Sequence, residues 1–170
     1  MSTYNLIASD DRCTVVSEYV PETKRSDAYQ SEAALEAEFI RMLRSQGYEY
    51  ITIEDEDALV ANLRTQLEIL NDIRFSDSEW KRFFTECIAS TNDGIVEKTN
   101  RIQVDNVQIL RRDDGSSKNI TLIDKKNIHN NRLQVINQYA TDKGEYDNRY
   151  DVTVLVNGFP MIHIELKRRG

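Results

Sequence analysis

The sequence YDVTVLVNGFPMIHIELK occupies residues 150–167 and predicts a β-hairpin. Two apolar runs flank Asn157-Gly158, a dipeptide typical of the tight turn between antiparallel strands. Side chains alternate between the two faces of a strand, so Glu165 and Lys167 share one face of the second run. A plain core strand would avoid two charges on one face. This hairpin therefore decides both the fold and the chemistry that we expect.

A carboxylate and an ammonium group on one strand face suit metal-assisted cleavage of a phosphodiester bond. Glu165 would hold Mg²⁺, and Lys167 would stabilise charge or help to position the attacking water. A second carboxylate is then needed on the neighbouring strand, and Asp151 opens that strand. The same residue types also suit a simpler structure, in which Glu165 and Lys167 form an ion pair at an exposed strand end.

The pairing of the two strands tests the metal site. If the loop of the hairpin has two residues, Asp151 lies opposite Ile164 and faces away from Glu165. A three-residue loop, or a bulge near Pro160, would return Asp151 to the face of Glu165. The metal site therefore requires one of these two departures from the simplest hairpin.

The first predicted helix offers a further carboxylate. Ser31 is a good N-cap, Gly47 is a natural stop, and apolar residues recur between them at helical spacing. Glu32 lies roughly 20° from the centre of the apolar stripe, and Glu36 lies roughly 60° from it. Glu32 is therefore the helix carboxylate that we expect to face the site, unless it is simply exposed in the first turn.

A rival placement of the site uses a different strand end. Asp124 and Lys126 follow an expected strand, and Asp105 lies upstream of them. These residues could supply the same two carboxylates and one ammonium group. Substitution of each aspartate separately would distinguish the two placements.

The cysteines and histidines match no metal-binding pattern. Cys13 and Cys87 lie far apart, which predicts a reduced, cytoplasmic protein. Cys87 falls on the apolar face of a predicted helix, so we expect a core residue rather than a nucleophile. His129 and His163 have no partner at zinc-binding spacing. We expect His163 to make a structural hydrogen bond or to touch a substrate.

The order of the elements predicts an α/β (α+β) fold, with helices first and a sheet afterwards. Residues 1–29 read as an irregular lead-in with one short strand, and residues 30–170 read as one domain. After Gly94 we expect extended structure. The expected helices begin at Ser31, after the acidic run 54–57, and at the capping box of Ser76 with Glu79. The expected strands are 48–53, 102–110, 119–124, 150–156 and 159–166. Residues 133–139 are expected to form either a strand or a short helix.

Composition excludes several classes of protein. With 170 residues, 39% of them hydrophobic and 30% charged, the chain suits one domain with its own core and is unlike a disordered or collagen-like chain. No apolar run approaches the ~18 residues that a membrane span needs. The formal net charge is −7, which disfavours a module that grips DNA by itself but not an enzyme with carboxylates at a metal site.

Several stretches resemble the restriction (R) subunit of type I restriction–modification enzymes. The likeness covers most of the chain and keeps its order. It implies the N-terminal nuclease region of that subunit, with a PD-(D/E)xK core in which helices flank a mixed β-sheet. The stretches are 148–158 (NRYDVTVLVNG), 163–170 (HIELKRRG), 29–32, 43–48, 76–80 and 122–127 (LIDKKN).

The resemblance implies roles for four residues. Asp151 and Glu165 match the metal-binding carboxylates, which implies Mg²⁺ as the cofactor. Lys167 matches the catalytic lysine, and Glu32 matches the helix carboxylate. Tyr150 stands where the family's motif often has Pro, a departure that is common in restriction subunits.

Two further departures concern the extent of the chain. The family continues into a helix with Gln and Tyr beyond the lysine strand, whereas this sequence stops three residues after Lys167. The nuclease core is therefore expected to be truncated after the Glu-x-Lys strand. The sequence also lacks the Gly-x-x-x-x-Gly-Lys-Ser/Thr loop of an ATP-driven motor, so we expect a fragment of a much larger, ATP-binding protein.

The resemblance implies an endonuclease domain that cuts double-stranded DNA after ATP-driven translocation by the full protein. Methyltransferase (M) and specificity (S) subunits would then select and hold the DNA. The alternative is a non-catalytic docking module between the motor and the methyltransferase core, in which Glu165 and Lys167 form only an ion pair. Metal binding through Asp151 and Glu165 separates these two hypotheses.

Overall fold

The computed structural model divides the chain into two compact units, Met1–Gln30 and Ser31–Gly170. In the first unit β1 pairs antiparallel with β2, where the sequence predicted one short strand. These strands are β1 (Tyr4–Ser9) and β2 (Thr14–Glu18). The residues that the structure describes are 4–9, 14–18, 31–141 and 148–167.

Local capping signals set where the first three helices of the second unit begin. The Ser31 side chain accepts a hydrogen bond from the Ala34 amide, and Asp55 caps the next helix in the same way. Ser76 and Glu79 form a reciprocal capping box. Each start agrees with the sequence prediction. The helices are α1 (Glu32–Ser45), α2 (Glu56–Asn71) and α3 (Asp77–Phe83), which continues into a π-helical turn, η1 (Phe84–Ile88).

The segment after Gly94 is helical, and the prediction of extended structure there is wrong. α4 (Ile95–Gln103) begins without a side-chain cap, and its first two residues are β-branched and largely exposed. The usual sequence signals of a helix are therefore weak. Long-range contacts hold α4 instead, because the Arg101 guanidinium donates to the Cys87 carbonyl (2.7 Å) and to the Asp93 carboxylate (2.6 Å).

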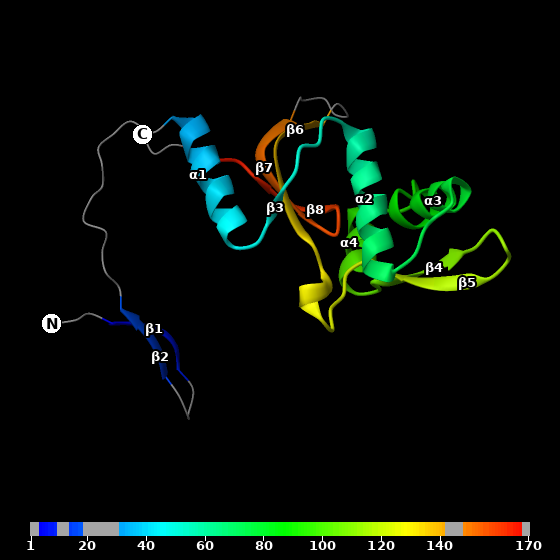
Figure 1. The fold of residues 1–170 in the computed structure, drawn as a ribbon, viewed down its shortest axis with the longest axis horizontal. Coiled ribbons are helices and arrows are strands. Elements are labelled where there is room, and N and C mark those ends of the chain that lie inside the picture. The colour runs from blue at the N-terminus through cyan, green and yellow to red at the C-terminus, as the bar shows by residue number, and fades with distance from the viewer. Residues whose placement is uncertain (1–3, 10–13, 19–30, 142–147, 168–170) are drawn as a thin grey trace. The chain divides into compact units, whose positions relative to one another are not determined.

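A mixed four-stranded sheet contains the predicted hairpin. Its strand order is β3-β6-β7-β8, with β3 parallel to β6 and the other neighbours antiparallel. α1 contacts β3 and β7 (Figure 1). This arrangement of helices around a mixed sheet confirms the α/β (α+β) class. The strands are β3 (Glu49–Tyr50), β6 (Leu133–Thr141), β7 (Asn148–Val156) and β8 (Phe159–Ile164).

A separate two-stranded hairpin packs against the helices. β4 contacts α3, and β5 contacts α2 (Figure 1). The strand predicted at 102–110 begins later because α4 occupies its first residues. The elements are β4 (Val107–Arg111) and β5 (Ser117–Thr121), followed by the short 3₁₀ helix η2 (Ile128–Asn130).

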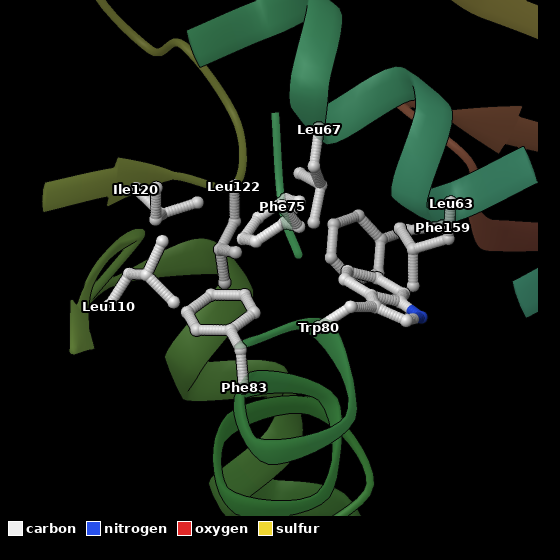
Figure 2. Close-up of a cluster of buried hydrophobic side chains, with 9 residues drawn as sticks. All are labelled: Leu63, Leu67, Phe75, Trp80, Phe83, Leu110, Ile120, Leu122 and Phe159. Carbon is white, nitrogen blue, oxygen red and sulfur yellow. The ribbon is translucent and has the colours of Figure 1, made fainter. Parts of the chain in front are cut away.

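The main core lies between α2, α3 and the β4–β5 hairpin, and it takes Phe159 from β8 (Figure 2). The ring centroid of Phe75 lies 5.3 Å from that of Trp80 and 5.7 Å from that of Phe83. Cys87 packs against this core, and its partial burial raises the pKa of its thiol. These contacts agree with the prediction of a core residue. The buried members are Leu63, Leu67, Phe75, Trp80, Phe83, Leu110, Ile120, Leu122 and Phe159.

The turn between β7 and β8 is packed into the protein. Asn157 has φ 50° and Gly158 has φ 83°, the left-handed values that a two-residue hairpin turn of this type requires. The Asn157 side chain is buried and donates to the Leu122 carbonyl (3.1 Å) and to Asn131 Oδ1 (2.7 Å). It also accepts from the backbone amide of Arg132 (2.8 Å). These hydrogen bonds fix the loop at two residues.

A β-bulge then changes the pairing of the hairpin. The ladder passes from Leu155 opposite Pro160 to Val154 opposite Ile162, which leaves Met161 as the extra residue. Beyond the bulge Val152 pairs with Ile164. Of the two departures that the metal site requires, the structure therefore has the bulge and not the longer loop.

Candidate active site

The bulge sets the register at the open end of the hairpin, where Asp151 and Glu165 follow the last paired residues. Since Val152 pairs with Ile164, continuation of the same register places Asp151 opposite Glu165, one residue beyond β8. The backbone amide of Leu166 donates to Asp151 Oδ2 at 2.6 Å. The segment that carries Glu165 therefore stays beside β7 after the strand has ended.

Lys167 forms an ion pair with Glu165. Its Nζ lies 3.2 Å from Glu165 Oε1, and the two side chains are 76% and 65% exposed. An ion pair as exposed as this contributes little to stability, because water screens it. Both groups are thus accessible to a charged ligand.

His163 is held between two neighbours on β7. Its Nδ1 lies 2.9 Å from Thr153 Oγ1, and its ring stacks on Tyr150 with centroids 4.1 Å apart and planes at 17°. Partial burial lowers the pKa of His163. The prediction of a structural hydrogen bond at His163 is confirmed.

The backbone beside this site is irregular. Regular alternation would place Tyr150 on the opposite face from Thr153, yet Tyr150 reaches the ring that Thr153 contacts. On the neighbouring strand, Gln138 occupies the position opposite Asp151 in the β6–β7 ladder, and it has a left-handed φ of 54°. The irregular geometry on both strands thus coincides with the position of Asp151.

The helix carboxylate that reaches the sheet is Glu36. It accepts a hydrogen bond from Asn137 Nδ2 at 2.6 Å and another from the side chain of Gln138, the residue opposite Asp151. Glu32 is instead exposed in the first turn of α1. The angular position of Glu36 at the margin of the apolar stripe is the signal that could have identified it, because a polar side chain there borders the sheet.

The rival aspartates have different surroundings. Asp124 Oδ1 accepts from the amides of Lys126 (3.0 Å) and Asn127 (2.9 Å), and Oδ2 accepts from Asn130 Nδ2 (2.8 Å). Its hydrogen bond with the Asn127 amide is the largest cause that lowers the pKa of Asp124. We interpret this carboxylate as the organiser of its own turn. Asp105 is exposed in the loop between α4 and β4.

Two features are absent from the described part of the chain. No group of three or more His, Cys, Asp or Glu side chains in that part of the chain could by itself hold a metal ion. No described helix is both long and apolar enough to cross a membrane.

The fold and this hairpin define a mixed α/β domain with a carboxylate pair and a lysine at the end of two strands. The chain belongs to the family described as type I restriction enzyme R protein N terminus, which matches residues 29–170. It is therefore related to the N-terminal region of an R subunit, as the resemblance implied.

Two relatives illustrate the range of similarity. The type I restriction enzyme EcoprrI endonuclease subunit of Escherichia coli is 45% identical over 165 residues, which cover 96% of this chain and 52% of that protein. The type I restriction enzyme SsaAORF53P endonuclease subunit of Staphylococcus saprophyticus is 41% identical over 147 residues, which cover 84% of this chain and 15% of that protein. The chain thus spans about half the length of one relative and a small part of the other.

Proposed function

We propose that this chain is the nuclease domain of a type I restriction enzyme R subunit, with a PD-(D/E)xK core that hydrolyses DNA phosphodiester bonds with Mg²⁺. One observation carries the proposal: the bulge at Met161 sets a register that, continued by one residue, has Asp151 opposite Glu165, the carboxylate that Lys167 contacts. A hairpin without that bulge would separate the two carboxylates onto opposite faces. The names of the relatives, which are endonuclease subunits, support the same activity.

The residues at the hairpin fit Mg²⁺. This cation prefers oxygen ligands, and it is usually held by one or two carboxylates while water and substrate phosphate complete its shell. Asp151 and Glu165 would hold the ion, which would act as a Lewis acid on the phosphoryl group. The Leu166 amide fixes Asp151 by its Oδ2 atom.

Lys167 would stabilise the negative charge that develops on the phosphate during water attack. It now contacts Glu165, so binding of the substrate would have to separate this exposed ion pair. An exposed pair separates at little cost in free energy. Glu36 would act indirectly, because it fixes the Gln138 side chain opposite Asp151.

The rest of the enzyme would supply what this chain does not. We propose that double-stranded DNA is held and selected by M and S subunits and moved by an ATP-driven motor in the full protein, in the cytoplasm. The net charge of −7 supports this division, because the domain itself has no excess of basic residues for phosphate binding. Cleavage would then follow translocation.

A second candidate function is that of a docking module without catalysis. The exposed ion pair between Glu165 and Lys167 favours it, since that pair satisfies both charges without a metal. A docking module has no reason to bind Mn²⁺ through Asp151 and Glu165. Titration of the chain with Mn²⁺ therefore separates the two functions, with Asp151→Ala and Glu165→Ala as the variants.

The decisive experiment uses the complete R subunit assembled with its partner subunits. We expect Glu165→Ala to abolish plasmid cutting while ATP hydrolysis, which reports folding and assembly, continues. Asp105→Ala and Asp124→Ala serve as matched controls at the rival placement and should still cut. Cutting that survives Glu165→Ala would contradict the proposal and favour the docking module, or the rival site if Asp124→Ala loses cutting.

A further inference from the structure

The imidazole of His163 is fixed in both position and orientation. It lies opposite Thr153 in the ladder, with 2.9 Å between Nδ1 and Oγ1. Tyr150 covers one face of the ring at a centroid distance of 4.1 Å. Two independent contacts from β7 therefore hold a side chain that is still exposed to solvent. His163 is also two residues before Glu165, and thus on the strand face that leads to the candidate metal site.

The burial of Thr153 favours one of the two ring nitrogens of His163 as the carrier of the proton. The Thr153 residue is 0% exposed, and a buried hydroxyl needs an acceptor for its proton. Nδ1 of His163 is the acceptor within reach among the described residues. A neutral imidazole that accepts at Nδ1 carries its proton at Nε2. The opposite tautomer would leave the hydroxyl proton of Thr153 without an acceptor in that part of the structure.

We propose that His163 is a substrate-binding residue whose Nε2–H donates a hydrogen bond to a phosphate oxygen of the DNA strand being cut. This inference rests on the proposed nuclease function. Phosphate oxygens are the groups on a DNA backbone that accept such bonds. Thr153 and Tyr150 are positioning residues, because they act on the substrate only through His163.

The tautomer can be measured directly on this chain. Only two histidines are present, so His129→Gln leaves His163 as the single source of imidazole signals in nitrogen-15 NMR spectra. We expect the Nε2–H tautomer in the parent and in Thr153→Ser. In Thr153→Val we expect a mixture of both tautomers, because the hydroxyl that selects one of them is gone. A parent that carries its proton at Nδ1, or a Thr153→Val variant with an unchanged spectrum, would overturn the proposal.

A matched pair of substitutions tests the contact with DNA in the assembled enzyme. His163→Gln keeps an N–H donor, whereas His163→Phe keeps the ring that stacks on Tyr150 and removes the donor. We expect His163→Phe to slow cleavage roughly ten- to a hundredfold, the loss typical of a hydrogen bond to a charged group, with ATP hydrolysis unchanged. The single variants His163→Gln and Thr153→Ser should each keep most of the parental cleavage rate.

Glu165→Ala, measured alongside, separates the two proposals. If Glu165→Ala abolishes cutting and His163→Phe cuts at the parental rate, the role of His163 is wrong and the nuclease proposal stands. If Glu165→Ala still cuts, the nuclease proposal fails, and the role of His163 fails with it. Equal losses in His163→Phe and His163→Gln would also overturn the role, because they would show that the donor is not what matters.

Discussion

At the scale of single residues, Gly158 shows how closely the functional hairpin is seated on α2. A Cβ atom added to Gly158 would lie 2.6 Å from the Cα atom of Leu63, and the residue has φ 83°. Neither the space nor the backbone conformation accepts a side chain. The hairpin that carries the candidate site is therefore held at its closed end by direct backbone packing.

Gly115 provides a matched control for this contact. It has a similar φ of 85°, but a Cβ atom there would meet nothing within 4 Å. We expect Gly115→Ala to lower the free energy of unfolding by about 1 kcal/mol through backbone strain alone, and Gly158→Ala by about 3 kcal/mol because overpacking is added. Urea unfolding of both variants measures the difference. Equal losses would show that the hairpin does not press on α2.

Cys87 gives a second prediction at this scale. Because burial raises the pKa of its thiol, little of it is ionised at pH 8, and access to the sulfur is restricted. In a Cys13→Ser background we expect iodoacetamide to label native Cys87 much more slowly than the urea-unfolded chain. Mass spectrometry over time gives both rates. Equal rates in the two states would point to an exposed, reactive thiol and against a core role.

At the scale of elements, the sequence predicts what local contacts decide. Ser31, Asp55 and Ser76 each cap a helix through atoms only three residues away, so their signals are visible in the sequence. α4 has no side-chain cap. Arg101 holds it instead, through hydrogen bonds to residues 8 and 14 positions earlier in the chain, and such contacts leave no local signal in the sequence. The Met161 bulge is equally non-local, because it depends on how the packed turn meets the strand. The sequence therefore identifies Asp151, Glu165 and Lys167 as candidate site residues, but it does not predict the bulge that sets the pairing of their strands.

The turn of the β4–β5 hairpin is tied to the start of α3 by one carboxylate. Asp113 accepts hydrogen bonds from the hydroxyls of Ser76 and Ser78 and from the Arg82 guanidinium. Its own amide donates to Glu79, the buried member of the capping box, at 3.0 Å. The cap of α3 and the hairpin turn therefore form one polar network.

This network predicts a dependence of stability on pH. Hydrogen bonds from Ser76, Ser78 and Arg82 lower the pKa of Asp113 from 3.8 to about 2. The folded state therefore binds its proton less readily than the unfolded state. The stability that Asp113 contributes is fully present above pH 3.8 and is lost as the pH falls toward 2.

Asp113→Asn removes this titration. We expect the difference in unfolding free energy between parent and variant to shrink as the pH falls from 5 to 2.5 in urea titrations. Asn119→Ala, at an exposed residue of β5 that does not ionise, is the control and should show no comparable trend. A difference that is constant over this range would show that Asp113 does not titrate with folding.

At the scale of the whole molecule, every described core residue lies in the second compact unit, Ser31–Gly170. Among the residues that the structure describes, both hydrophobic clusters consist of residues of that unit. A shortened chain that begins at Ser31 should therefore unfold in urea with the same midpoint and slope as the full sequence. A clear drop in the midpoint would show that residues 1–30 contribute to the stability of the second unit.

The bulge in β8 has a consequence for how the gene can vary. Met161 is the extra residue of the bulge, so loss of the Met161 codon can be absorbed by regular pairing of the strand, which leaves Asp151 opposite Glu165 and His163 opposite Thr153. Gain of one codon cannot be absorbed in this way, and the shifted register turns Glu165 to the opposite face of the sheet from Asp151. The hairpin thus tolerates shortening by one residue at the bulge but not lengthening. In a library of single-codon variants at this point, we expect the deletion to keep nuclease activity and the insertions to lose it.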